Sequence, residues 1–177
     1  MVAIKRNREK LKTLIHYIAW KCIDPAVLGA IKLNKVLWVS DLWAYVKWGA
    51  PITGEHYVKR QFGPVSPSVL GLVRELEAAK LLVTRRRDFF GNEKVDYLAL
   101  AKPDITGFTA DEISLVDEAI QFVCYEHTAL GISNKTHDAI WQLAELGEEI
   151  PYEAMLVSHL AEVTPEDVAW ARDLKVA

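Results

Sequence analysis

The chain has 177 residues, of which 51% are hydrophobic and 25% charged, as in an ordinary folded domain. No apolar run reaches the roughly 20 residues that a membrane-spanning helix needs, and the N-terminal MVAIKRNREK lacks the apolar core of a signal peptide. These features predict a single compact domain in the cytoplasm, with no membrane segment.

The net charge of −3 conceals an uneven distribution. Residues 1–102 contain 18 Lys and Arg against 9 Asp and Glu, whereas residues 103–177 contain 3 against 15. This asymmetry predicts either an acidic or nucleic-acid partner for the first half, or contact between the two halves within one fold. We favour contact, because DNA-binding domains are usually basic overall.

A first amphipathic helix is predicted over residues 5–23, packed on a longer helix over residues 31–48. In the longer helix apolar residues occupy nearly every angular position, which is typical of a helix buried on all sides at the centre of a domain. Gly49 is its predicted C-terminal cap, and Pro51 follows.

One stripe of this central helix combines polar and aromatic side chains at alternating spacings of four and three: Asn34, Trp38, Asp41, Tyr45 and Trp48. Two interpretations are open. The first, which we favour, is an inward polar pair whose hydrogen bonds hold the neighbouring loops, since buried Asn and Asp must find partners. The second is a partner-binding surface, because Trp and Tyr beside polar groups are typical of binding hot spots.

Residues 55–62 are predicted to form a short extended segment. The Gly63-Pro64-Val65-Ser66-Pro67 sequence then predicts a sharp turn. In this turn Ser66 caps a third helix, and Pro67 takes the first position of that helix. The third helix is expected to continue to about Lys80.

Residues 81–89 and 94–100 are predicted to form two strands around a short loop over residues 90–93. Helix, helix, short strand, helix and hairpin is the order of a winged helix. The predicted fold class is therefore mainly α (α+β), a single helical domain with one small β-hairpin and a winged-helix-like core.

The second half is predicted to be helical beyond Pro103. Thr109 and Glu112 form a capping box for the first of its helices, and Gly131-Ile132-Ser133 interrupts the pattern. The helices expected here span residues 109–123, 134–146, 151–155 and 165–175.

Motifs for catalysis or metal binding are absent from the sequence. None of the five histidines lies in an H-E-x-x-H or H-x-H pattern, and neither Cys22 nor Cys124 belongs to a C-x-x-C pair. Phosphate-binding glycine loops and a G-x-S-x-G elbow are also missing. We therefore predict no enzyme activity, no cofactor and no metal site, and expect the two cysteines to pack in the core.

Four sequence motifs occur in a characteristic order. They are residues 32–41 of the central helix, the following GAPITG at residues 49–54, FGPV at residues 62–65, and Thr136-His137-Asp138 with Trp141. Together they closely resemble the Panacea domain, the phage-associated domain of SocA-like antitoxins, over about residues 31–158. The sequence departs from the family at Trp38-Val39-Ser40-Asp41, where the family usually shows a tyrosine pair before alanine and aspartate.

This resemblance implies an antitoxin that binds and neutralises a protein toxin encoded by a neighbouring gene, in an oligomer with that toxin. Some relatives also deliver the toxin to a protease. Because one scaffold faces many unrelated toxins, we expect its motif residues to be mostly structural. The family-motif residues, structural or toxin-binding, are Lys32, Asn34, Trp38, Asp41, Tyr45, Gly63, Pro64, Thr136, His137 and Trp141.

The main alternative is a winged-helix DNA-binding regulator. Arg85, Arg86 and Arg87 on the first hairpin strand would contact phosphates together with basic residues of the first helix. Alternation along a strand places at least one of the three on each face. Against this alternative, the third helix offers a mixed surface with little to read base edges.

Overall fold

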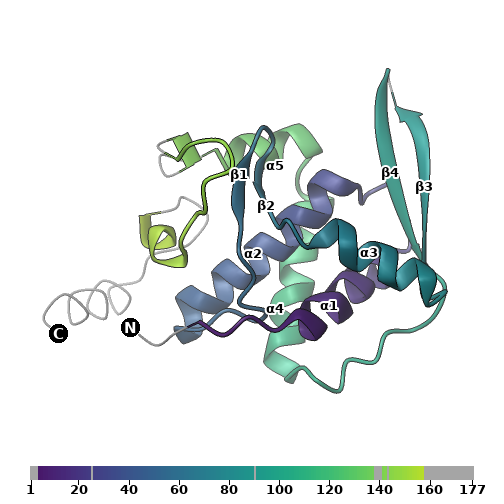
Figure 1. Ribbon diagram of the computed structural model, residues 1–177, viewed down its shortest axis with the longest axis horizontal. Coiled ribbons are helices and arrows are strands. Elements are labelled where there is room, and N and C mark those ends of the chain that lie inside the picture. The colour runs from purple at the N-terminus through teal and green to yellow at the C-terminus, as the bar shows by residue number, and fades with distance from the viewer. Residues whose placement is uncertain (1–3, 25, 90, 138–140, 143, 158–177) are drawn as a thin grey trace, which may run out of the picture.

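The computed structural model describes residues 4–24, 26–89, 91–137, 141–142 and 144–157. It is a mainly helical α+β fold with two small antiparallel hairpins, which confirms the predicted class (Figure 1). The elements in chain order are α1 (Arg8–Lys21), α2 (Ala30–Trp48), β1 (Val58–Arg60), β2 (Gly63–Val65), α3 (Val69–Ala78), β3 (Leu82–Phe89), β4 (Asn92–Ala99), α4 (Ala110–Ile120), the π-helical η1 (Gln121–Tyr125), α5 (Ala129–Lys135) and the 3-10 helix η2 (Tyr152–Val157).

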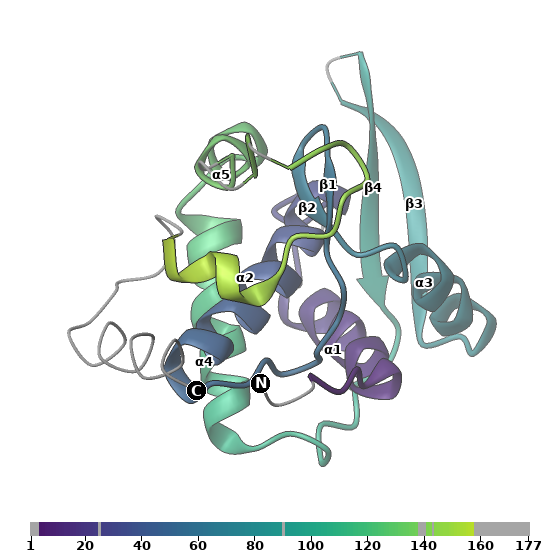
Figure 2. The same cartoon turned by 60° about the vertical axis from the view of Figure 1, so that its left-hand side comes forward.

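Helix α2 lies at the centre, as predicted. Every residue from Leu33 to Leu42 is buried, and the helix contacts α1, α4, α5, η1 and both hairpins. The 3-10 helix η2 lies across α2 (Figure 2). Gly49 ends α2 in the left-handed conformation, φ 72°, and its N–H donates to the Tyr45 carbonyl, which confirms the predicted cap. None of the helices in the described residues is long and apolar enough to cross a membrane.

Helix α1 is shorter than predicted. Asn7 is its N-cap, because the Asn7 side chain accepts a hydrogen bond from the Lys10 N–H, so the helix begins at Arg8. At its other end Cys22 is buried, with its Sγ 4.0 Å from the Sγ of Cys124 in η1. Both thiols are free and packed in the core, as expected from the sequence.

The two oppositely charged halves are in contact. Helix α4 packs on α2, and its acidic residues pair with lysines of α1: Lys10 Nζ lies 2.5 Å from Glu112 Oε1, and Lys21 Nζ lies 2.7 Å from Asp117 Oδ2. The predicted contact between the halves is therefore confirmed, and it neutralises part of the positive charge of α1.

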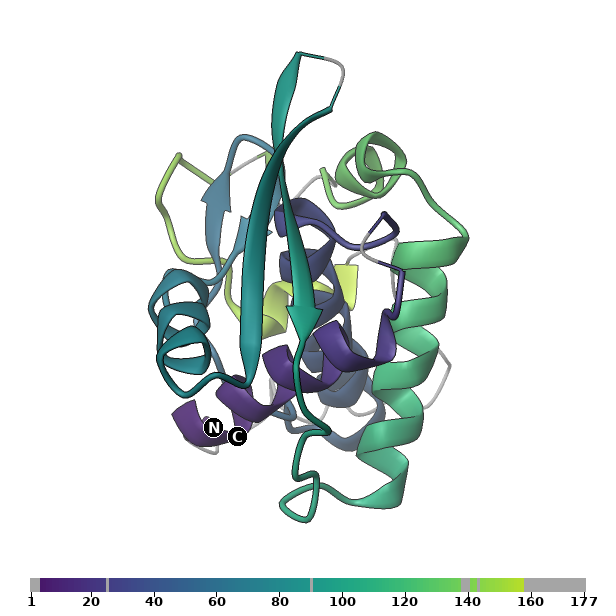
Figure 3. The ribbon, with the colours of Figure 1, turned by 90° about the vertical axis from the view of Figure 1, so that its right-hand side faces the viewer.

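Strands β3 and β4 pair along their whole length, from the Leu82–Ala99 pair at one end to the Phe89–Asn92 pair at the turn. Only residues 90–91 connect the strands, so Asn92 and Glu93, expected in the loop, belong to β4 instead. Helices α1, α2 and α3 precede this hairpin in the order of a winged helix, and Figure 3 shows the hairpin extending beyond the helices.

A second hairpin was missed at the predicted turn. Gly63-Pro64-Val65 is strand β2, which pairs with β1 in the register Val58 with Val65. The turn lies at residues 61–62, and α3 begins only at Val69. Ser68 is the N-cap residue in place of Ser66, whose Oγ instead accepts a hydrogen bond from the Ser68 N–H.

The helix boundaries predicted after η1 were also wrong. Gly131-Ile132-Ser133 lies inside α5, because Thr128 caps this helix by accepting from the Gly131 N–H. This helix ends at Lys135, and Thr136 and His137 are not helical, so no helix begins at residue 134 as predicted. Residues 141 and 142 are helical, whereas residues 138–140 and 143 of the predicted range lie outside the described residues. The helix predicted from Pro151 is the 3-10 helix η2, and the one predicted over residues 165–175 lies outside the described residues.

Ser40 is a polar exception inside the α2 core. Its Oγ is buried and has no hydrogen-bond partner among the described residues. Burying a hydroxyl without a partner costs about 1–3 kcal/mol. We therefore expect Ser40→Ala to raise the free energy of unfolding by about 1 kcal/mol in urea denaturation. A decrease would show that the hydroxyl is satisfied in solution.

Candidate functional site

Asp41, midway along α2, is enclosed by hydrogen-bond donors. Its carboxylate is 0% exposed. It accepts from the Thr53 N–H at 2.7 Å and from the hydroxyls of Thr53, Tyr57 (2.9 Å) and Tyr152 (3.3 Å). One side chain of α2 thus holds both the segment that follows the helix and the start of η2.

The protonation states of this cluster fit those hydrogen bonds. Burial raises the pKa of Asp41, whereas the hydrogen bonds from Thr53, Tyr57 and Tyr152 act in the opposite direction. Burial and the nearby Asp41 carboxylate also raise the pKa values of Tyr57 and Tyr152 well above the usual tyrosine value. Both hydroxyls therefore remain protonated donors at neutral pH.

Asn34 occupies the same stripe about two turns earlier. Its Nδ2 donates to the Ala30 carbonyl at 2.9 Å, and its Oδ1 accepts from the Ser66 N–H at 3.2 Å. Asn34 and Asp41 therefore point inward and hold loops, as in the first of the two interpretations. Trp48, 41% exposed, is the member of the stripe that reaches the surface.

Aromatic rings of α2 complete this cluster. Trp38 packs edge-to-face on Tyr57 with ring centroids 5.0 Å apart, and Tyr45 lies 5.4 Å from Tyr152. Such pairs add to the stabilisation that burial of the rings provides. The two tyrosines that bind Asp41 are thus fixed in orientation by their neighbours.

A buried lysine joins α2 to the β1–β2 hairpin. Lys35 is 1% exposed, and its Nζ lies 3.5 Å from the Pro64 carbonyl oxygen. Gly63 and Thr136 border the same space, since a Cβ on Gly63 would lie 1.9 Å from Lys35 Nζ and 2.7 Å from Thr136 Oγ1. The sequence places Lys35 in the motif of residues 32–41 but gives no sign that it is buried, because most lysines on helices reach solvent.

Burial lowers the pKa of Lys35 from its ordinary value of 10.5 to about 7. The charged amine therefore costs stability at and below pH 7, and this cost is relieved as the pH rises from about 7 towards 10.5. We expect the free energy of unfolding of the wild type to rise in this window relative to Lys35→Met, by on the order of a few kcal/mol. Urea denaturation of both proteins across the window measures this difference, and parallel pH profiles would contradict it.

The Thr-His and Trp motif clamps the other side of the β1–β2 hairpin. Trp141 Nε1 donates to the Arg60 carbonyl at 3.3 Å, and Lys59 Nζ lies 4.1 Å from the Trp141 ring centroid. The imidazole of His137 stacks on Trp141 with centroids 3.6 Å apart. Thr136 is buried at the end of α5, and Trp141 is partly buried and packs against the core.

Lys32 holds a third segment to α2. Its Nζ donates to the Cys124 carbonyl of η1 at 2.8 Å, and burial lowers its pKa. The motif residues thus lie at the junctions between α2, the β1–β2 hairpin and the second half of the chain. In the described parts of the chain, no group of three or more Cys, His, Asp or Glu is placed to hold a metal ion.

The three hairpin arginines do not form one patch. Arg86 lines the side of the hairpin that faces α3, whereas Arg87 Nε lies 2.7 Å from the buried Asp96 Oδ2. Arg85 alternates with Arg86 and so shares the face of Arg87. The predicted distribution over both faces is confirmed.

Comparison with known proteins places this arrangement in a family. The family described as Antitoxin SocA-like, Panacea domain, matches residues 33–142, which is more than half of the chain. This match includes Asp41, Lys35, Gly63 and the Thr-His and Trp motif. No curated protein and no solved structure matches the chain. The chain belongs to the SocA-like antitoxin family with a Panacea domain.

Proposed function

We propose that this protein is a cytoplasmic antitoxin that neutralises a protein toxin by binding it directly, without turning over a substrate. The family match over residues 33–142 is the observation that carries this proposal. Asp41, Lys35 and Thr136 lie inside the fold at the junctions of its elements. Such an internal scaffold leaves the outer surface to recognise a partner.

The contacts of Asp41 and His137 favour binding over catalysis. Asp41 is fully enclosed and its carboxylate is engaged by four donors, so it has no access to a substrate. His137 stacks on Trp141 and supports the β1–β2 hairpin. These contacts support a structural role for both residues.

Co-expression with the product of the neighbouring gene tests the proposal. Neutralisation by binding is stoichiometric, so growth rescue should follow the ratio of antitoxin to toxin, and the two proteins should co-purify as a complex. Rescue without a complex contradicts direct neutralisation. Rescue at small antitoxin-to-toxin ratios, with loss of the toxin protein, would instead indicate delivery to a protease.

The DNA-binding alternative has less support. Arg86 and Arg87 face opposite sides of the hairpin, and lysines of α1 are paired with acids of α4. A phosphate-binding surface requires cations that face the same groove. Tight binding to specific DNA at physiological salt, without toxin binding, would replace the antitoxin proposal with this one.

A further inference from the structure

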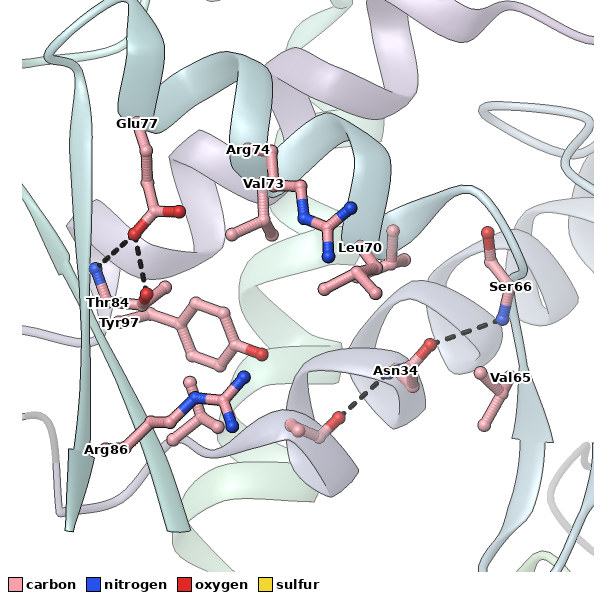
Figure 4. Close-up of a pocket in the computed structure, with 13 residues that line it drawn as sticks. Asn34, Val65, Ser66, Leu70, Val73, Arg74, Glu77, Thr84, Arg86 and Tyr97 are labelled. Carbon is pink, nitrogen blue, oxygen red and sulfur yellow. Dashed lines mark hydrogen bonds between the residues drawn. The ribbon is translucent and has the colours of Figure 1, made fainter.

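A groove lies between α3 and the face of the β3–β4 hairpin that carries Tyr97 (Figure 4). Its volume is about 290 Å³. Leu70 of α3 lines it and remains 59% exposed. Covering this surface would remove apolar area from water, which favours a bound partner. The apolar lining residues are Ala30, Val65, Val69, Leu70, Val73 and Val95.

Two polar groups in this groove have no hydrogen-bond partner among the described residues. Tyr97 is only 6% exposed, and its hydroxyl points into the groove without a hydrogen-bond partner in the part of the chain that the structure describes (Figure 4). The Arg74 guanidinium points into the same space and has neither an ion-pair nor a hydrogen-bond partner within those residues. Arg74 is exposed and the Tyr97 oxygen is not fully closed off from solvent, so water meets both donors in the free protein. An ionised acceptor that replaces this water makes stronger hydrogen bonds with them.

The charges around the groove favour an anionic group. Arg86 lines it, and its ion pair with Glu93 at 3.0 Å joins two largely exposed side chains, a kind of pair that contributes little and exchanges easily. Glu77 is the one acid among the described lining residues. Its Oε1 is already held by the Thr84 N–H at 2.9 Å and the Thr84 hydroxyl at 2.6 Å.

We propose that this groove binds a segment of the toxin in which a carboxylate is flanked by apolar side chains. The inference rests on the proposed antitoxin function. The Tyr97 hydroxyl and the Arg74 and Arg86 guanidiniums donate to the carboxylate, and the apolar neighbours of the carboxylate cover Leu70. Hydrogen bonds to an ionised acceptor are stronger than those to a neutral one, so the carboxylate fixes the position of the segment.

A protein segment fits this surface better than a nucleic acid does. The exposed side of α3 carries Leu70, Gly71 and Ala78 beside Arg74. Arg74 is therefore the one basic residue of this helix that could contact a phosphate. Nucleic-acid sites usually present runs of cations with few apolar groups. An apolar groove with separate guanidiniums instead matches an acidic side chain within an apolar sequence.

Tyr97→Phe is the most specific test, because it removes one oxygen and keeps the buried ring. The hydroxyl has no partner within the described fold, so we expect an unchanged or slightly higher melting temperature. Affinity for the purified toxin, measured by titration calorimetry, should fall about tenfold or more. An unchanged affinity would contradict a hydrogen bond from Tyr97 to the toxin.

Arg74→Glu tests the charge, with Arg85→Glu as its matched control. Both variants reverse one exposed arginine, but Arg85 lies on the face of the hairpin away from the groove. We expect Arg74→Glu to weaken toxin binding by about a hundredfold and Arg85→Glu to change it by less than about threefold. An Asp or Glu of the toxin whose replacement by Lys restores binding to Arg74→Glu would identify the carboxylate.

The outcomes separate the two proposals. If the wild type forms no complex with the toxin, the proposed function fails. If the wild type binds, but Tyr97→Phe and Arg74→Glu bind equally well, the groove inference fails and the antitoxin function stands. If the same two variants lose affinity for duplex DNA while toxin binding is retained, the groove is a nucleic-acid site and the inference is overturned.

Discussion

Replacing Asp41 by alanine is expected to lower the free energy of unfolding by roughly 3–5 kcal/mol. The change removes the acceptor of the Thr53 N–H and of the Thr53 and Tyr57 hydroxyls at the centre of the fold. The Tyr152 hydroxyl keeps the Glu55 carbonyl oxygen, 2.6 Å away, as an acceptor. Each buried donor left without a partner costs about 1–3 kcal/mol. Urea denaturation followed by tryptophan fluorescence measures the loss, and toxin rescue should fail because the protein unfolds.

Asp41→Asn is the control for this prediction. Its amide oxygen still accepts from the Thr53 N–H, but its NH₂ group faces the tyrosine hydroxyls as a donor, so those hydroxyls must rotate to accept. We expect a loss smaller than that of Asp41→Ala. If Asp41→Ala lost less than about 1 kcal/mol, the donors around Asp41 would have to find other partners in solution.

The role of this cluster could be partly predicted from the sequence. Asn34 and Asp41 are polar residues in a helix that is otherwise apolar on all sides, and a buried polar side chain must have partners. That reasoning predicts inward hydrogen bonds but does not identify the donors. Tyr57 follows α2 closely in sequence, whereas Tyr152 comes from the far end of the described chain, and only the packing of η2 on α2 brings it to Asp41.

Local signals failed where tertiary contacts decide the conformation. Gly63 and Pro64 are typical turn residues, yet here they form a strand, because Gly63 lies against Lys35 and the strand pairs with β1. Gly131 is a helix breaker by propensity, yet the Thr128 cap and the burial of Ile132 keep it helical. At Gly63 long-range packing outweighs the local preference, and at Gly131 packing acts together with the local cap against a preference of about 1 kcal/mol.

The groove could not be predicted from sequence for a related reason. Arg74, Arg86 and Tyr97 are separated by other elements in the chain and carry no common motif. Side chains alternate between the two faces of strand β3, so the sequence predicts that Arg86 lies on the face opposite Arg85 and Arg87. The sequence does not predict which of the two faces meets α3. That choice follows from the packing of α3 against β3, which aims all three side chains at one space.

Gly63→Ala is expected to be about as damaging as Asp41→Ala. Gly63 has φ 103°, a conformation that side chains other than glycine rarely adopt. An added Cβ would also lie 1.9 Å from Lys35 Nζ and 2.9 Å from Lys35 Cε, and Lys35 is only 1% exposed. Backbone strain and overpacking together predict a loss of about 3–5 kcal/mol in the free energy of unfolding.

Gly147→Ala separates these two causes. Gly147 has a similar φ of 91°, but nothing lies within 4 Å of the Cβ that alanine would add. Its loss should therefore reflect backbone strain alone, about 1–2 kcal/mol. Urea denaturation gives the loss in the free energy of unfolding for each variant. The difference between the two losses is the cost of the steric overlap between the added Cβ and Lys35. Equal losses in the two variants would show that Lys35 moves aside, and that the junction between α2 and this hairpin is looser than its contacts imply.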